Sequence, residues 1–147
     1  MYHELMLENQ TIFTKMVFER LAGEDLTVGQ PKVLEYLFSH NGAIQKDIAD
    51  ACLIEPATLT SLLSRMEKND LIVRKNKNED KRYSCVYLTE KGKKSGKIVI
   101  EKLNELEQNA LINFSKKETE MFISFLKKAN RNLKNIKEAE KNESNDK

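Results

Sequence analysis

The segment that most constrains the fold of this chain is residues 71–92, LIVRKNKNEDKRYSCVYLTEKG. A short apolar run leads into a basic loop, and an alternating pattern follows, with Val86 and Leu88 on one face and Cys85 and Tyr87 on the other. Two such runs around a short polar loop predict a β-hairpin. The segments before and after residues 71–92 are therefore expected to lie next to this hairpin in the fold.

The tip of this hairpin is strongly basic. Between Arg74 and Arg82 there are five cations and two anions, which gives nine residues a net charge of +3. A cationic hairpin suits contact with a phosphate backbone or insertion into a minor groove. A solvated charged loop has a similar composition. The sequence of the neighbouring segment therefore helps to distinguish a nucleic-acid contact from a solvated loop.

Residues 44–69, immediately before the hairpin, read as a helix-turn-helix. In the helix that Pro56 opens, a core stripe recurs at positions i, i+3, i+4 and i+7, namely Leu59, Leu62, Leu63 and Met66. The opposite face is small and polar with cationic ends, and comprises Ala57, Thr58, Thr60, Ser61, Ser64, Arg65 and Lys68. Such a face can approach base edges closely, and with the hairpin it predicts a winged helix-turn-helix.

The remaining helices flank this unit. The apolar positions of residues 3–21 have helical spacing and are Leu5, Ile12, Phe13, Met16, Val17 and Leu21. Thr27 is predicted to cap a helix with Gln30 and Pro31 in its first turn, burying Val33, Leu34, Leu37 and Phe38. A short helix with Ile44, Ile48, Ala49 and Cys52 inward is expected next. Thr89 and Ser115 are predicted to cap the last two helices, the latter in a capping box with Glu118.

The predicted fold class is therefore mainly α with a small β-hairpin. The winged helix-turn-helix spans 26–94, helices for dimerisation span 1–25 and 95–137, and residues 138–147 have almost nothing to bury and are expected to be disordered. One small winged helix cannot cover the apolar stripes of three flanking helices. An isologous homodimer is the expected solution, with a monomer whose terminal helices cover each other as the alternative.

Charge distribution supports a nucleic-acid partner. Residues 65–97 carry a net charge of +6, whereas residues 1–64 carry −5 and residues 98–147 carry +1. A basic middle between acidic or balanced flanks is an electrostatic footprint confined to one part of the molecule. No apolar run approaches a membrane span, and the first residues lack the pattern of a signal peptide, so a soluble cytoplasmic protein is expected.

Other chemistry finds little support in the sequence. His3 and His40 lack soft ligands at metal-binding spacing, and no phosphate loop, nucleophile elbow or acid/base pair is present, so no metal, cofactor or enzymatic activity is expected. Cys52 lies on a core stripe and is expected to be a buried hydrophobe. Cys85 is expected to be exposed and to be the more reactive thiol.

Three segments resemble the MarR family of bacterial transcriptional regulators: LTVGQPKVLEYL, IADACLIEPATLTSLLSRMEKNDLIVRK and NEDKRYSCVYLTEKG. The resemblance implies that Arg82 enters the minor groove, that Asp80 orients it, and that the helix from Pro56 lies in the major groove. The remaining hairpin cations are expected to contact phosphates: Arg74, Lys75, Lys77 and Lys81. Leu53 stands where the family commonly has glycine, and Glu55 stands where a serine cap is frequent.

The same resemblance implies a homodimeric repressor that binds a pseudo-palindromic duplex. It also implies a small aromatic or anionic effector, in a crevice lined by Phe13, Met16, Tyr36 and the second-last helix, although a constitutive regulator without an effector stays open. A winged helix that serves only protein interaction or dimerisation is the competing function. The basic wing with Asp80 and Arg82 favours the DNA-binding interpretation.

Overall fold

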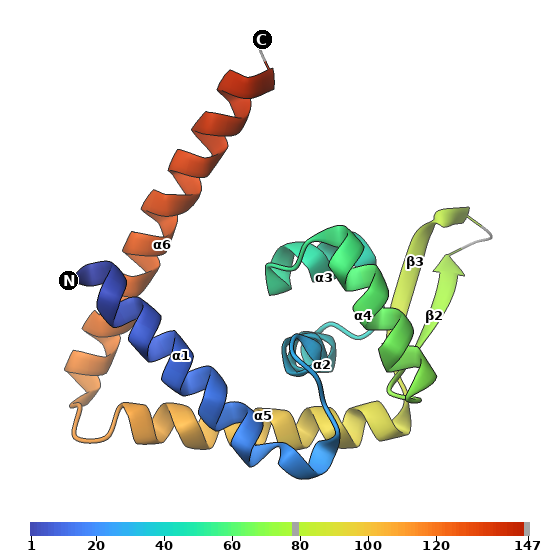
Figure 1. The fold of residues 1–147 in the computed structure, drawn as a ribbon, viewed down its shortest axis with the longest axis horizontal. Coiled ribbons are helices and arrows are strands. Elements are labelled where there is room, and N and C mark those ends of the chain that lie inside the picture. Colours follow the sequence, from blue (N-terminus) through green and yellow to red (C-terminus); the bar gives the residue numbers. More distant parts are fainter. Residues whose placement is uncertain (78–79, 146–147) are drawn as a thin grey trace. The chain divides into compact units, whose positions relative to one another are not determined.

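The computed structural model describes residues 1–77 and 80–145, with the side chains of residues 77, 80–82 and 145 outside the description. Six α-helices and three short strands make up the described chain (Figure 1). They are α1 (Tyr2–Arg20), α2 (Gln30–Ser39), β1 (Ala43–Ile44), α3 (Gln45–Cys52), α4 (Pro56–Lys68), β2 (Ile72–Lys77), β3 (Asp80–Leu88), α5 (Glu90–Ala110) and α6 (Lys116–Asn145), with a 3₁₀ turn at Ala22–Glu24. The predicted fold class, mainly helical with a hairpin, is confirmed.

The chain forms two compact units, Met1–Glu107 and Gln108–Lys147. In the second unit, the Ser115 hydroxyl accepts from the Glu118 backbone N–H at 3.2 Å and the Glu118 carboxylate accepts from the Ser115 N–H at 2.8 Å. This confirms the predicted capping box. The helix α6 continues to Asn145, which differs from the disorder expected from residue 138. Its apolar side chains are exposed within this unit: Met121, Phe122, Phe125, Leu133 and Ile136.

The core of the first unit lies where α2, α3, α4, the sheet and α5 meet. The α4 stripe predicted from spacing is buried along its whole length: Leu59, Leu62, Leu63 and Met66. Val17 and Leu21 from α1 and Val99 and Leu106 from α5 join the same cluster. Burying four such side chains on one helix face fixes α4 firmly, since each contributes about 1.5–3 kcal/mol.

In α2, one residue that was predicted to be buried is on the surface. Phe38 is 45% exposed, although its position in the sequence suggested burial. The helix α5 passes α2 at Gly96, where a Cβ atom would meet Phe38 Cδ2 at 3.2 Å. The ring therefore lies at the edge of the α2–α5 contact rather than inside it.

The sheet is antiparallel with strand order β1-β3-β2. The hairpin register pairs Ile72 with Leu88 and Arg74 with Val86. The strand β1 was not predicted, because two residues carry no periodicity, and it takes Ile44 out of the helix expected there. Since β3 is the central strand, Cys85 is 7% exposed, and the expectation of an exposed thiol was wrong.

The turns that open the helices also differ in detail from expectation. Gly29, with φ +90°, is the N-cap of α2, and not Thr27. The buried Gln30 side chain nevertheless reaches back, and its Oε1 accepts from the Thr27 N–H at 3.0 Å. The capping box is thus half formed. Gln30 makes its expected contact, whereas Gly29, which has no side chain and adopts a left-handed conformation, takes the N-cap position expected for Thr27.

Candidate nucleic-acid interface

The polar face of α4 points away from the core. All six residues that the sequence assigned to the major groove are exposed on this helix: Thr58, Thr60, Ser61, Ser64, Arg65 and Lys68. The buried leucine stripe lies on the other side of the same helix. A helix held by one face with its small polar face free has the shape that reading the major groove requires.

Two hydroxyls on this face are engaged within the protein. Thr60 Oγ1 donates to the Pro56 carbonyl at 3.0 Å, and Ser64 Oγ donates to the Thr60 carbonyl at 3.0 Å. Gln45 Nε2, from the start of α3, donates to Thr60 Oγ1 at 3.3 Å. Gln45 belongs to no motif in the sequence, and its hydrogen bond joins α3 to α4 on the exposed side.

The start of α4 departs from the best possible cap. Glu55 is the N-cap residue, and its side chain makes no capping hydrogen bond. Leu53, which ends α3, has φ 55° and ψ 43°, a left-handed conformation that glycine adopts with less strain. Its side chain is 80% exposed. The structure therefore explains why a glycine at position 53 and a serine at position 55 would suit this turn.

The structure describes the side chains of some of the predicted hairpin contacts and not of others. Lys75 is exposed, with its Nζ 5.5 Å from the centre of the Tyr87 ring. Arg74 is half-buried and bound to Glu67, so it differs from the free phosphate contact that was expected. The predicted roles of Lys77, Asp80, Lys81 and Arg82 fall on side chains outside the described ones.

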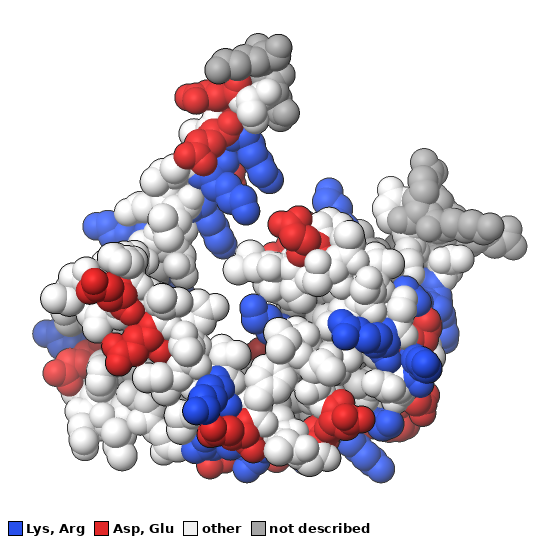
Figure 2. All heavy atoms as spheres, in the orientation of Figure 1, with Lys and Arg blue, Asp and Glu red and all other residues white. Residues whose placement is uncertain are grey.

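Basic residues gather near α4. Figure 2 shows Lys and Arg side chains together over the C-terminal half of α4 and the base of the hairpin. Arg65 and Lys68 are exposed cations of this part of α4, and Lys75 is an exposed cation of β2. These positions agree with the basic footprint that the sequence places at residues 65–97.

A cluster of hydrogen bonds joins the start of α5 to the turn after α4, and we call it the α4–α5 clamp (residues 69–71 with 89–92). The Thr89 hydroxyl donates to the Asp70 carbonyl at 2.6 Å and accepts from the Gly92 N–H at 2.9 Å, which confirms the predicted cap. The Thr89 N–H donates to the Leu71 carbonyl at 3.1 Å, and Lys91 Nζ donates to the Asn69 carbonyl at 2.8 Å. Residues 88–92, LTEKG, thus tie the start of α5 to the end of α4, a role that the residue types alone do not indicate.

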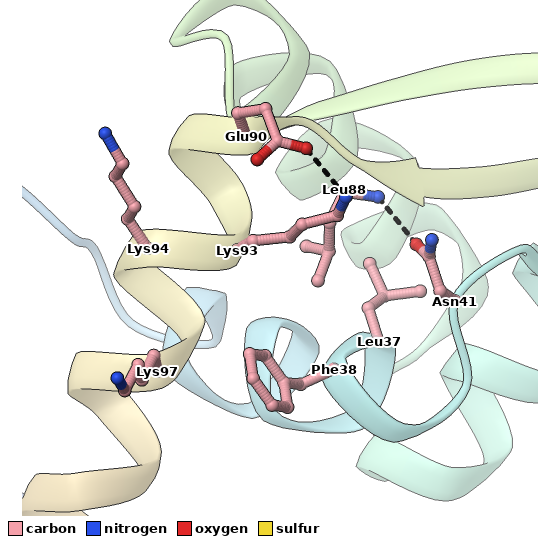
Figure 3. Close-up of a pocket in the computed structure, with 8 residues that line it drawn as sticks. All are labelled: Leu37, Phe38, Asn41, Leu88, Glu90, Lys93, Lys94 and Lys97. Atoms are coloured by element: carbon pink, nitrogen blue, oxygen red, sulfur yellow. Dashed lines mark hydrogen bonds and ion pairs between the residues drawn. The ribbon is translucent and has the colours of Figure 1, made fainter.

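Two of the cavities in the first unit are lined by residues that the structure describes. One of about 350 Å³ lies between α2, the end of β3 and the first turns of α5 (Figure 3). Its lining includes three lysines of α5, which are Lys93, Lys94 and Lys97. It also includes apolar side chains of α2 and β3, which are Leu37, Phe38 and Leu88. Asn41 and Glu90 complete the lining. Lys93 is paired with Glu90 at 2.7 Å. An apolar floor beside ammonium groups fits a small amphipathic anion.

The second cavity, of about 470 Å³, lies between α2 and α3 and includes Tyr36, Glu35 and Cys52. Tyr36 was expected to line a crevice with Phe13 and Met16, but neither of those two residues lines either cavity. Burial, with repulsion from Glu107 as the smaller cause, raises the pKa of the Glu35 carboxyl.

The thiols give no sign of a reactive site. Cys52 is buried as predicted, and its Sγ lies 3.6 Å from the Lys32 carbonyl oxygen, to which it donates. Burial is the largest influence on this thiol and raises its pKa, which opposes formation of the nucleophilic thiolate. Among the residues that the structure describes, no group of three or more His, Cys, Asp or Glu side chains could hold a metal ion, and no helix is long and apolar enough to cross a membrane.

Comparison with known proteins settles the family. Residues 26–83 match the model of the MarR family. Over 104 residues the chain is 31% identical to the transcriptional regulator HosA of Escherichia coli O157:H7. The matched region covers 71% of this chain and 77% of HosA. The chain belongs to the MarR family. The match to an organic hydroperoxide resistance transcriptional regulator of Bacillus subtilis, 32% identical over 100 residues, covers 62% of this MarR-family chain and 68% of the relative.

Solved structures agree with this assignment. A DNA complex of Staphylococcus aureus MepR is 27% identical and superimposes with a TM-score of 0.84, over 90% of this chain and 98% of MepR. The transcriptional regulator SlyA, at 24% identity, shares the fold with a TM-score of 0.80 over 90% of this chain and 92% of SlyA. The predicted winged-helix architecture is confirmed, and MepR shows a similar chain bound to DNA.

Proposed function

We propose that this MarR-family chain is a homodimeric repressor that binds a pseudo-palindromic DNA duplex. The observation that carries the proposal is the exposed polar face of α4, opposite a fully buried leucine stripe. Two copies related by a two-fold axis would present two α4 helices to successive major grooves of one duplex face. Neither a catalytic role nor a resident cofactor is part of the proposal, and a cytoplasmic location is what duplex binding requires in a bacterium.

The contacts divide by their chemistry. The exposed α4 residues read base edges in the major groove, with Arg65 directed to guanine. Lys75, Lys77 and Lys81 contact phosphates, which adds affinity without sequence information. Arg82 enters a narrow minor groove, where the negative potential is enhanced, and Asp80 orients it. The roles of residues 77 and 80–82 rest on the basic hairpin sequence and on the family resemblance.

Dimerisation is supported by apolar surface that each unit leaves uncovered. In α1, Leu5 and Ile12 are exposed on the side that the helix spacing predicted to be buried. In the second unit, α6 exposes Phe122, Phe125 and Leu133. Apolar faces of this extent are unusual on monomers and typical of subunit contacts, so we assign residues 1–25 and 95–137 to the dimer interface and residues 26–94 to DNA binding.

The proposal is tested by fluorescence anisotropy on duplex DNA from the upstream region of the gene, against a scrambled duplex, at several salt concentrations. Specific binding with log K falling steeply against log salt is expected. Replacing Arg82 with Ala should weaken specific binding by about 1–3 kcal/mol without changing the dimer, as judged by sedimentation. Absence of binding even at low salt would instead favour a winged helix used only for protein interaction.

We further propose that the cavity of Figure 3 takes a small anionic effector, toward which Lys94 and Lys97, two residues of its lining, turn their ammonium groups on binding. In Figure 3 the Lys94 side chain extends away from Leu37 and Leu88, so its rotation is part of the proposal. The probe is 2-naphthoate, compared with the neutral 2-naphthamide, in ¹⁵N-edited NMR titrations of the dimer. Shifts at the amides of Leu88 and Gly96 are expected with naphthoate alone. They should be lost when Lys94 and Lys97 become Gln, but not when Lys32, which lines the other cavity, does. Equal binding of the amide, or shifts elsewhere only, would refute this site.

A further inference from the structure

The guanidinium of Arg74 is held by the recognition helix. Arg74 Nη2 donates to Glu67 Oε2 at 2.7 Å and Nε donates to the same oxygen at 3.2 Å. The backbone N–H of Arg74 donates to Glu67 Oε1 at 3.0 Å, so both carboxylate oxygens are used. A further contact from Nη2 reaches Ser64 Oγ at 3.3 Å, on the exposed face of α4.

This pairing removes the charge of Arg74 from the electrostatic footprint. The side-chain hydrogen bond from Arg74, followed by the backbone one, lowers the pKa of the Glu67 carboxyl, which is therefore ionised at neutral pH. The arginine and the glutamate then form a locally neutral pair. A solvent-exposed cation such as Lys75 differs, because it can release counterions on meeting a phosphate.

The position of the pair in the fold gives it another use. Glu67 lies in the last turn of α4 and Arg74 lies in β2, so the bonds bridge the turn formed by residues 69–71. One end of this link is the helix proposed for the major groove and the other is the hairpin proposed for the minor groove. Bonds to both the backbone and the guanidinium fix direction as well as distance, which a single surface ion pair does not.

We propose that Glu67 and Arg74 are positioning residues that set the orientation of the wing relative to the recognition helix, and that they thereby contribute to sequence discrimination rather than to phosphate attraction. The inference rests on the proposed DNA-binding function. Both elements must fit their grooves at once, so a change in their relative orientation weakens base contacts on the specific duplex. Binding to non-specific DNA, which depends on charge, changes little.

The experiment compares Glu67→Ala, Arg74→Ala and the double variant, on a duplex that the wild type selects from a random pool and on its scrambled control. Each single variant should lower the ratio of specific to scrambled affinity by about tenfold, as loss of one good base contact does. The double variant should be no worse than either single one, because both remove the same link. The salt dependence of the double variant should stay that of the wild type, because the double change removes a locally neutral pair as a whole.

Lys75→Ala is the matched control, since Lys75 is the next residue of the same strand and is exposed. It should weaken binding to both duplexes alike and reduce the salt slope by about one. The inference is overturned if Arg74→Ala behaves like Lys75→Ala while Glu67→Ala strengthens binding. That pattern would make Arg74 a phosphate contact and Glu67 a repelling anion.

A second measurement keeps the inference separate from the proposed function. Residual dipolar couplings of the DNA-free dimer report the orientation of the β2–β3 hairpin relative to α4. They should change in Glu67→Ala, and in Glu67→Gln if the alanine variant fails to fold, but not in Lys75→Ala. Unchanged couplings in the Glu67 variants overturn the inference. A wild type without preference between the duplexes overturns the DNA-reading function, and the couplings then decide the positioning role alone.

Discussion

Replacing Gly92 with alanine should damage the α4–α5 clamp. A Cβ atom on Gly92 would lie 1.9 Å from the Leu71 carbonyl oxygen and 3.0 Å from the carbonyl carbon. A comfortable C···O contact is about 3.3 Å, so the start of α5 must move away from the turn by roughly 1.4 Å. Backbone atoms on the opposing side cannot turn aside as a flexible side chain does.

The size of the effect follows from what that movement breaks. Thr89 makes two hydrogen bonds to this turn, to Asp70 and Leu71, and a shift of that size stretches both. Losing them removes about 1 kcal/mol each, and the overpacking adds about 1–3 kcal/mol. The better helix propensity of alanine returns at most about 1 kcal/mol. We expect a net loss of about 2–4 kcal/mol and a fall in Tm on the order of 10 °C.

Gly96 provides the matched control in the same helix. A Cβ atom there would meet Phe38 Cδ2 at 3.2 Å, and Phe38 is exposed enough to move. Gly96→Ala should therefore be neutral, or stabilising by up to about 1 kcal/mol. Urea unfolding followed by circular dichroism, at one protein concentration because a dimer is expected, measures both variants. Gly92→Ala within about 0.5 kcal/mol of the wild type, the range of harmless surface changes, would refute the reasoning.

Three further changes test other parts of the first unit. Leu53→Gly should stabilise by roughly 1 kcal/mol in urea, because it relieves a left-handed φ of 55°; a loss would mean that the leucine side chain makes useful contacts. Glu55→Ser should add the missing N-cap bond of α4, raise stability by about 1 kcal/mol and strengthen DNA binding by removing an anion; weaker DNA binding would show that Glu55 itself contributes. For Glu67, whose pKa is lowered in the folded state, the advantage of the wild type over Glu67→Gln should be about 1 kcal/mol or less at pH 7, given its partial exposure. This difference in the free energy of unfolding is present above the ordinary glutamate pKa of about 4.3 and should disappear as the pH falls through the lowered pKa of the folded state. Urea titrations at several pH values measure it. A difference that does not change with pH would contradict the prediction.

Features with a regular or short spacing along the sequence were predictable from it. The α4 stripe occupies four positions at helical spacing, and all four side chains are buried because periodicity reports directly which face meets the core. The capping box at Ser115 and the cap at Thr89 were also predictable, because each depends on residues within three positions of each other.

What the sequence did not reveal depends on contacts between distant segments. Phe38 is exposed because α5 meets α2 at Gly96, and that meeting point is set by the tertiary structure. Cys85 is buried because a two-residue strand, 41 positions earlier at Ile44, pairs with it. Arg74 is paired with Glu67 of the preceding helix, and a charge count along the sequence does not show that pairing. Charge counted along a sequence therefore overstates the charge available to a ligand.

The pairing of β1 with β3 has a consequence for how such a chain changes its target. The Gly42 N–H donates to the Val86 carbonyl at 2.8 Å, and Ala43 pairs with Val86, so both ends of the segment 43–86 meet at one residue. Everything proposed to read DNA lies inside this closed segment, and the helices proposed to hold two copies together lie outside it. Such a segment can be exchanged between relatives as a cassette, with entry and exit already adjacent. Exchange of the segment at these two points is expected to change the proposed DNA contacts while the proposed dimer helices keep their sequence.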